Sequence, residues 1–599
     1  MKKSIGVCLL LFFFLRVLWG SDLSDFQRAK YLYRKQEYNQ ALLYFEKLSK
    51  YNNPVQNFAL YYAAVCNEQL KQYKTATPVY EKLINEYPRF PLAWSIKRKI
   101  SDYYFNQRQW SYFTEKSLWA KAKELYSRGD RDKAQEAFHE YKVQYPSTEN
   151  YIEADYYLGI NALHAQKNSM ANWCFDRYIK GKGKNIDWAR YYKVVLLDKQ
   201  DKYNLAENGY RWLAGQYTGS GVGICAMEKL ALLFHRQDKY QDAITAYKEF
   251  VNKYPQHYKA RNAYFQMGRI RYLEENNSAA NYCFRKAAGY KASGNDTAET
   301  LYMQYKTENK QNQDNGNLLI EIAEKYFYTY YGWLARNKLK LQYSDANEQK
   351  TINSQSSMWQ RLIPGVKTFL KINDYEDAAI VVKDYKENNP TANLSLPLFL
   401  IELYEKAEDY YSAQRFGESV WVSYEKLGKL KALPLELWQK GYPQCYETII
   451  RKTAVENGLD PLLVMALIRE ESRFNKDSGS YAGAVGLMQL MPSTAAAEAK
   501  KNDMPVDGDL KDPTCNIKLG VMHLAYLIKA YKGNISYAMA AYNGGINVAN
   551  RWIHESKELP EEEFTERIGY VQSRYYVKKV LKSYWTYQWL YNEGIANIK

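Results

Sequence analysis

The chain has 599 residues, of which 46% are hydrophobic and 16% aromatic, with 59 tyrosines and only 16 prolines. This composition excludes an intrinsically disordered chain, supplies enough apolar surface for several domains and suits packed helices better than an all-β fold. The formal net charge is +17, yet residues 443–599 carry 19 basic and 18 acidic side chains, so the excess lies upstream. A basic arm favours an acidic polymer or surface as partner, unless the charge serves only solubility.

The first 21 residues have the pattern of a cleaved signal peptide. Two lysines precede an apolar run over residues 5–15, and the small residues Gly20 and Ser21 stand at a plausible cleavage point. Eleven apolar residues are few for a membrane span. We therefore expect export to the periplasm, with membrane contact peripheral at most. An uncleaved anchor and a cytosolic chain with an apolar start are the alternatives.

Residues 22–442 contain a loosely repeated pattern that predicts stacked helix pairs. A charged or aromatic start, a small residue and an apolar stripe at helical spacing recur, and most copies end in Tyr-Pro or Asn-Pro. The copies are QEYNQALLYFEKL (36–48), KQYKTATPVYEKLINEYP (71–88), DRDKAQEAFHEYKVQYP (130–146), DKYQDAITAYKEFVNKYP (238–255) and NDYEDAAIVVKDYKENNP (373–390). They resemble degenerate tetratricopeptide repeats, and a solenoid of this kind offers a surface for a possible protein partner or merely positions the next domain.

Six cysteines follow the predicted signal peptide, and they lie far apart with no CxxC pair. They are Cys66, Cys174, Cys225, Cys283, Cys445 and Cys515. Several sit in apolar helical stretches, so we expect mostly buried thiols and neither a disulfide framework nor a metal site. The six histidines show no metal-ligand spacing, and we expect neither a metal nor a cofactor.

Near residue 443 the tyrosine-rich repeats stop and small residues become frequent, so we place a final domain over residues 443–599. Asp460 and Pro461 begin a helix as N-cap and first helical residue. The helix ends in LIREESRF (467–474), with two adjacent glutamates that each share a face with apolar residues. Burial would raise the pKa of whichever glutamate lies against apolar surface and make it a proton donor. Periodicity does not decide between Glu470 and Glu471, and both could instead pair with the neighbouring arginines.

Two further motifs follow in this domain. SYAGAVGLMQLMPSTA (480–495) combines glycines with an apolar segment that holds one amide, Gln489, which suits hydrogen bonding to a neutral polar ligand such as a sugar. NISYAMAAYNGG (534–545) places Tyr542 before an Asn-Gly-Gly turn, where its hydroxyl can enter a cleft or its ring can plug a core.

Glu471-Ser472, Ser480, GAVGLMQLMPSTA and AYNGG, in this order, resemble the catalytic domain of the soluble lytic murein transglycosylases, with a goose-lysozyme-like fold. The resemblance covers about 460–585, and the aromatic segment YFYTYYGWLARNKL (326–339) weakly resembles part of the family's helical region. It implies an all-α chain, a superhelix of TPR-like repeats followed by an α-rich lysozyme-like domain. Since the family's catalytic glutamate precedes a serine, it selects Glu471 and leaves Glu470 a neighbour of little chemical consequence.

The resemblance also implies glycan contacts from Ser480, Gln489, Met491 and Tyr542, with Met488–Met491 lining the cleft. One departure is Gln572, which stands where the family tends to have a glutamate, in a string that keeps Arg574, Tyr576 and Val577. We expect Gln572 to alter affinity without abolishing the chemistry.

The implied reaction is cleavage of the β-1,4 bond between N-acetylmuramic acid and N-acetylglucosamine in peptidoglycan, giving a 1,6-anhydro product. Glu471 would act as single acid and base, since only Asp477 is acidic between Glu471 and Glu498. The alternative is a TPR scaffold that binds peptidoglycan without cutting it. A nucleic-acid binder is excluded by the expected export and by the absence of a binding motif in the sequence.

Overall fold

The computed structural model describes residues 21–312, 315–341, 356–389, 395–480, 482–504, 508–556 and 559–591. The signal-peptide prediction falls on residues 1–20, outside these ranges, with Ser21 alone described. The described residues are helical, apart from loops and two isolated β-bridges, Gly479–Val485 and Val485–Leu490. The predicted all-α class is therefore confirmed. Within the same ranges, no helix has both the length and the apolar character needed to cross a membrane.

Contacts divide the chain into two compact units, Met1–Ile96 with Ala323–Lys599 and Lys97–Ile322. The first contains a helix over 21–34, then α2 (Tyr38–Ser49), α3 (Gln56–Gln69), α4 (Tyr73–Glu86), α18 (Tyr330–Lys338), α19 (Ser356–Leu362), α20 (Val366–Leu370), α21 (Tyr375–Asn388), α22 (Ser395–Lys406), α23 (Tyr410–Lys426), η2 (Leu430–Ala432), α24 (Leu435–Gly441), α25 (Glu447–Glu456), α26 (Pro461–Ser472), α27 (Pro492–Lys501), α28 (Pro513–Ala530), α29 (Ile535–Gly544), α30 (Ile546–Glu555), α31 (Glu561–Arg567) and α32 (Val571–Tyr591). These units divide the chain after Ile96 and after Ile322, and they do not test the predicted domain boundary at residue 443, which stays a prediction.

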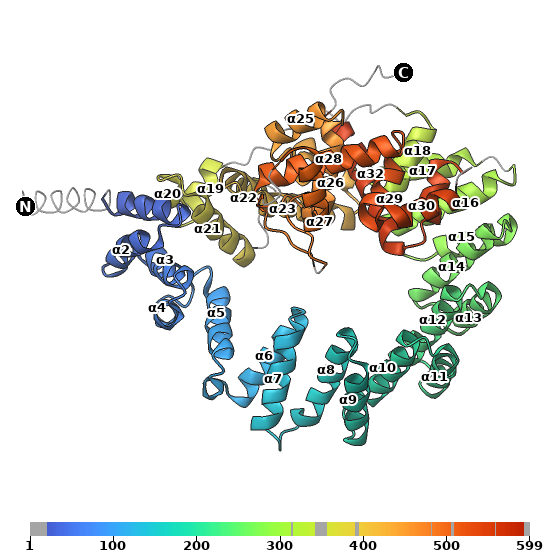
Figure 1. Ribbon diagram of the computed structural model, residues 1–599, viewed down its shortest axis with the longest axis horizontal. Helices are drawn as coiled ribbons and strands as arrows, with labels where there is room; N and C mark the ends of the chain where they lie inside the picture. Colours follow the sequence, from blue (N-terminus) through green and yellow to red (C-terminus); the bar gives the residue numbers. More distant parts are fainter. Residues whose placement is uncertain are drawn as a thin grey trace, which may run out of the picture. The chain divides into compact units, whose positions relative to one another are not determined.

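The second unit is a series of helices, each packed on the next along the chain (Figure 1). They are η1 (Trp110–Tyr112), α6 (Glu115–Ser127), α7 (Arg131–Gln144), α8 (Asn150–His164), α9 (Asn168–Lys180), α10 (Ile186–Lys199), α11 (Tyr203–Gln216), α12 (Gly221–Arg236), α13 (Tyr240–Lys253), α14 (Lys259–Leu273), α15 (Asn277–Ala288) and α16 (Gly294–Asn309). Two more helices cross the unit boundaries, α5 (Ala93–Asn106) and α17 (Gly316–Lys325).

Small residues let the paired helices approach closely, as the repeat pattern predicts. A Cβ on Gly159 of α8 would lie 2.7 Å from the Phe175 ring of α9, and one on Gly268 of α14 would lie 2.7 Å from the Phe284 ring of α15. The same contact thus recurs in two repeats. The predicted helix ends are also confirmed, since α4, α7 and α13 each stop immediately before a Tyr-Pro pair.

Four of the six described cysteines are buried, namely Cys66, Cys174, Cys283 and Cys445, and all six are free thiols. Burial raises the pKa of the Cys66 thiol to about 12, which keeps it protonated and unreactive. The prediction of mostly buried thiols is confirmed.

A buried ionic cluster ties the start of the first unit to its α21. Lys30, in the helix over 21–34, lies 3.2 Å from the Asp377 carboxylate, which also accepts a 2.6 Å hydrogen bond from the Tyr62 hydroxyl. All three side chains are at most 3% exposed. Because breaking a buried pair leaves an uncompensated charge, this cluster fixes the N-terminal helix on α21.

Candidate active site

The two adjacent glutamates lie in the last turn of α26. Asp460 caps the helix through a 2.8 Å hydrogen bond from the Leu462 amide, and Pro461 occupies the first helical position. The helix is apolar and buried from Leu462 to Ile468, and it ends at Arg473, which has a left-handed backbone. Because α26 is buried up to Ile468, its last turn places Glu470 and Glu471 at the edge of the core.

Glu471 is a largely buried carboxyl with one directional partner. The Tyr576 hydroxyl of α32 donates a 2.5 Å hydrogen bond to its Oε1. The pKa of Glu471 is raised to about 7: burial is the largest cause, the Tyr576 hydrogen bond acts against it, and the negative charge of Glu470 adds a smaller increase. A carboxyl of this kind holds a proton near neutrality and can also release it.

The pKa of Glu470 is shifted in the opposite direction from that of Glu471, although the two residues are adjacent in sequence. Burial would raise its pKa, but Arg469, Lys582 and the Ser583 hydroxyl together hold the pKa below its ordinary value. Its Oε1 accepts hydrogen bonds from Arg469 and, at 2.5 Å, from Ser583 of α32. Glu470 therefore stays ionised and anchors α26 to α32. The expectation that it has little chemical consequence stays a prediction, and its charge makes a small contribution to the raised pKa of Glu471.

Tyr542 lies beside Glu471 at the end of α29. Burial and the charge of Glu471 raise the pKa of its phenol well above the ordinary value, so the hydroxyl is a permanent donor. It donates a 2.7 Å hydrogen bond to the Met488 carbonyl, which leaves the phenol oxygen as an acceptor. The following turn is fixed by a 2.9 Å hydrogen bond between Ser573 of α32 and the Asn543 side chain.

Ser480 and Gln489 lie on one loop, where both mainly brace the backbone. The Ser480 hydroxyl accepts a 2.9 Å hydrogen bond from the Ala484 amide. The Gln489 side chain donates to the carbonyls of Ser478 (3.1 Å) and Gly486 (2.9 Å). Since the amide donors of Gln489 are used within the loop, its carbonyl oxygen is the group left to accept a hydrogen bond from a ligand.

A buried asparagine, absent from the predicted site, holds this loop. Asn516 of α28 is fully buried, donates to the carbonyls of Val485 (3.0 Å) and Leu510 (2.9 Å), and accepts from the Met488 amide (2.8 Å). Gly486 lies against it with a φ of +82°. Asn516 thereby positions the Met488 carbonyl that receives the Tyr542 hydroxyl.

The remaining predicted residues differ in placement. Met491 is 39% exposed at the N-cap of α27, where an apolar side chain can meet a ligand. Met488 is fully buried, with its sulfur close to Gly520, so the expectation that the whole segment from Met488 to Met491 lines a cleft is wrong for this side chain. Gln572 is exposed in the first turn of α32, one turn before Tyr576.

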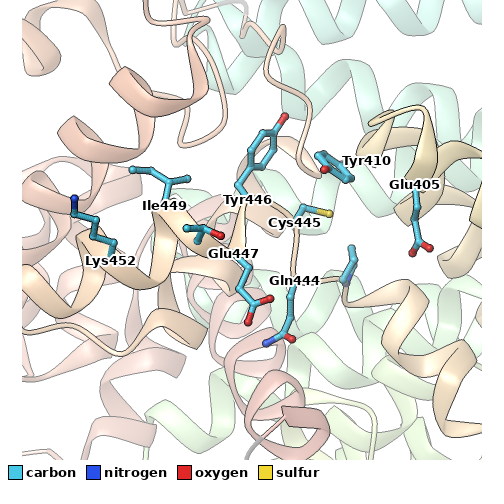
Figure 2. A pocket seen from close by; sticks show the side chains of 10 residues that line it. Glu405, Tyr410, Gln444, Cys445, Tyr446, Glu447, Ile449 and Lys452 are labelled. Atoms are coloured by element: carbon cyan, nitrogen blue, oxygen red, sulfur yellow. The ribbon is translucent and has the colours of Figure 1, made fainter.

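A separate pocket of about 560 Å³ lies where α25 meets α22 and α23, and Figure 2 shows its lining side chains. Tyr446, with a left-handed backbone, and Tyr410 stand between Glu405 and Lys452 in this view. None of the predicted site residues lines it.

Comparison with known proteins gives the site its context. Residues 448–565 match the family model of the transglycosylase SLT domain, and residues 58–89 and 226–257 match that of a tetratricopeptide repeat. The chain carries an SLT domain behind tetratricopeptide repeats. The resemblance to soluble lytic murein transglycosylases is thereby confirmed.

Two curated relatives match about a quarter of this chain. A putative soluble lytic murein transglycosylase of Haemophilus influenzae is 36% identical over 154 residues, or 25% of this chain and 26% of the relative. The soluble lytic murein transglycosylase of Escherichia coli K12 is 32% identical over 153 residues, 24% of either chain. The chain thus matches about a quarter of the length of these relatives.

Solved structures share the fold at low identity. The 70 kDa soluble lytic transglycosylase of Escherichia coli has a TM-score of 0.55 at 14% identity, over 95% of this chain and 97% of that one. A complex of the 70 kDa soluble lytic transglycosylase with bulgecin A gives a TM-score of 0.55 at 15% identity, over 96% of this chain and 97% of that one. At this identity the likeness concerns the fold alone.

The SLT match ends before the helix that completes the site. Glu471, Ser480, Gln489, Met491 and Tyr542 lie within residues 448–565, whereas Gln572 and Tyr576 lie on α32 beyond them. The aromatic segment of α18 supports α32: the Tyr331 hydroxyl donates a 2.6 Å hydrogen bond to Glu566, and Lys578 of α32 lies 3.0 Å from the same carboxylate. The helix outside the SLT match is therefore held in place by the region upstream of it.

Proposed function

We propose that the protein is a peptidoglycan lytic transglycosylase. It would cleave the β-1,4 bond between N-acetylmuramic acid and N-acetylglucosamine and form 1,6-anhydro muropeptides. The observation that carries the proposal is Glu471, a largely buried carboxyl whose pKa is raised to about 7, mainly by burial, and which has a tyrosine donor on one oxygen. This group suits a reaction in which one residue first gives and then takes a proton.

In the first half of the reaction, Glu471 acts as the acid. Tyr576 donates to Oε1, so the proton of the carboxyl resides on Oε2 and passes from there to the glycosidic oxygen as the bond to C1 breaks. The carboxylate formed is stabilised by the same Tyr576 hydrogen bond, because a bond to an ionised acceptor is stronger than one to a neutral acceptor. The acetamido group of the substrate would stabilise the positive charge at C1.

In the second half, the Glu471 carboxylate takes the proton of the C6 hydroxyl while that oxygen attacks C1. The new bond closes the 1,6-anhydro ring, and Glu471 regains the proton it gave, so no water is consumed. Glu470 does not act as a second catalytic carboxylate, since it is committed to Arg469 and Ser583. Asp477 is exposed and paired with Lys476, which leaves Glu471 as the acid and base.

Tyr542 would orient the acetamido group. Its hydrogen is donated to the Met488 carbonyl, so its oxygen can accept the N–H of the acetamido group and increase the electron density on the acetamido carbonyl. Ser480, the Gln489 carbonyl oxygen, Met491 and Gln572 would contact the glycan around it. We place the activity in the periplasm after removal of residues 1–21, with any protein partner on the helical repeats.

The test is mass spectrometry of fragments that residues 22–599 release from purified cell wall. Muropeptides lighter by one water and resistant to reduction at the sugar end are the expected products. Reducing ends would instead identify a hydrolase. Release of nothing by a folded protein that binds glycan would favour the scaffold alternative. Glu471→Gln should abolish turnover and leave glycan binding largely intact, and loss of binding in this variant would contradict the role given to Glu471.

A further inference from the structure

A buried carboxylate next to the site has no part in the mechanism above. Glu498 of α27 has a side chain that is 5% exposed. Its Oε1 lies 3.1 Å from Nδ1 of His523 on α28 and 3.1 Å from Nζ of Lys501, one turn later on α27. Because an unpaired buried carboxylate is costly, these two contacts explain how α27 can carry Glu498 on its inner face.

The histidine of this pair reaches the site. The ring centroid of His523 lies 5.6 Å from that of Tyr542 on α29, with the ring planes inclined by 52°. One nitrogen of His523 therefore contacts Glu498 while its ring lies against the side chain that would orient the acetamido group. Aromatic contacts at this distance prefer a limited range of ring orientations.

The other charged and titratable groups around His523 complete its surroundings. Lys501 is 53% exposed and contacts the same Glu498 oxygen as His523. Its Nζ lies 4.4 Å from the ring centroid of Tyr526 on α28. The Tyr526 centroid in turn lies 6.5 Å from that of His523. Lys501 and Tyr526 thus lie toward solvent, and the fixed contact of the imidazole on the inner side is Tyr542.

We propose that His523 is a positioning residue for the proposed reaction: held by Glu498, its ring fixes the orientation of Tyr542. Two contacts thereby set the orientation of the Tyr542 side chain: its hydroxyl donates to the Met488 carbonyl, and its ring packs against that of His523. This inference rests on the role of Tyr542 in the proposed function. It adds a pair of residues, from α27 and α28, that would act on the reaction without touching the substrate.

A double-mutant cycle tests the inference on the full mature chain. We expect His523→Leu to lower kcat about tenfold with little change in KM, because a small displacement of an orienting group acts on the transition state. In a Tyr542→Phe background the same change should have no further effect, since His523 acts only through the Tyr542 hydroxyl. An equal loss in both backgrounds, or no loss in the wild type, would overturn the inference.

Conservative variants separate the two contacts of the imidazole. His523→Phe keeps a ring against Tyr542 and loses the hydrogen bond to Glu498, whereas His523→Asn keeps a donor near the place of Nδ1 and loses the ring. We expect kcat of His523→Phe to exceed that of His523→Leu by more than kcat of His523→Asn does, and the reverse order would overturn the assignment. His554→Leu, at an exposed histidine of α30, is the matched control and should leave kcat unchanged.

Crystal structures keep the two proposals apart. If the wild-type chain releases no anhydro products, the proposed function fails, and the inference is judged on the position of Tyr542 alone. A Tyr542 hydroxyl that leaves the Met488 carbonyl in His523→Leu supports the inference. A hydroxyl that keeps this 2.7 Å contact in the variant overturns it.

Discussion

Tyr576 and Glu471 are 105 positions apart in the chain, yet the tyrosine hydroxyl donates a 2.5 Å hydrogen bond to Oε1 of the glutamate. The contact joins α32 to the end of α26 and occupies Oε1, so the proposed mechanism assigns the proton transfer to Oε2. It also moderates the effect of burial, since a donor aimed at a carboxylate favours the ionised form. The pair combines an acid that can hold its proton at neutrality with a donor that stabilises the carboxylate once the proton has left.

Tyr576→Phe should raise the pKa of Glu471 above its wild-type value. Because Glu471 must be protonated to begin the reaction, the alkaline limb of the pH profile of kcat/KM should move to higher pH. The maximal rate should fall about tenfold, in proportion to one hydrogen bond to a charged group. Kinetics across pH 5 to 9 measure both effects, and an unshifted alkaline limb would show that Tyr576 does not act on Glu471.

Glu470→Gln should move the same limb the other way. The neutral amide removes the charge that raises the pKa of Glu471, so the alkaline limb should shift to lower pH. The amide keeps a hydrogen-bonding oxygen for Ser583 but leaves the buried Arg469 with fewer acidic partners, mainly Glu418 at 3.4 Å. We therefore expect a stability loss of about 2 kcal/mol beside the kinetic shift. A shift in the same direction as that of Tyr576→Phe would contradict this account.

Glu471→Gln should stabilise the fold above neutral pH. A carboxyl whose pKa is raised on folding destabilises the folded state once the pH is high enough to ionise it in the unfolded chain. For Glu471 this cost grows from about pH 4.5, the pKa in the unfolded chain, to about pH 7, the pKa in the folded chain, and is constant above that. Glutamine does not titrate, so the advantage of the variant should grow over this window to on the order of 3 kcal/mol. Denaturant unfolding at pH 4.5 and pH 8 measures the difference, and an equal effect at both values would contradict the raised pKa.

Local sequence patterns predicted much of the architecture. The Tyr-Pro pairs stop α4, α7 and α13 because proline blocks the next turn, and the small residues of the repeats mark where helices approach. Asp460 and Pro461 begin α26 as expected. These features depend on neighbours a few residues away, so the sequence carries them directly.

The contacts that tune the site depend on residues distant in the chain. Tyr576 was visible only as part of a string near the C-terminus, and no periodicity links it to Glu471. Three further polar residues each stand alone on an apolar helix face: Asn516, Glu498 and His523. Such a residue indicates that a buried hydrogen-bond partner exists, but the sequence does not identify the partner. The opposite pKa shifts of the adjacent glutamates likewise depend on distant residues: burial dominates at Glu471, whereas at Glu470 the effect of burial is outweighed by Arg469 together with Lys582 and Ser583 of α32.

Gly486→Ala should disrupt the loop that carries Ser480 and Gln489. A Cβ there would lie 2.2 Å from the Asn516 amide nitrogen and 2.3 Å from the Leu510 carbonyl, in a backbone with φ of +82°. We expect a loss of about 3 kcal/mol, with lower activity because the Met488 carbonyl would move away from Tyr542. Gly483→Ala is the matched control: its φ is +92° but nothing lies within 4 Å of a new Cβ, so the cost should be about 1 kcal/mol. Equal losses would show that backbone strain alone matters.

Gln572→Glu should change affinity and leave the chemistry intact. The side chain is exposed in the first turn of α32, one turn before Tyr576, so it can reach a glycan beside Glu471 without touching the carboxyl. A carboxylate in the first turn of a helix is favoured by the helix dipole and accepts hydrogen bonds from sugar hydroxyls more strongly than an amide does. We expect KM for glycan strands to fall several-fold at constant kcat, while Gln572→Ala should raise KM. A change in kcat with constant KM would place this residue in the chemical step instead.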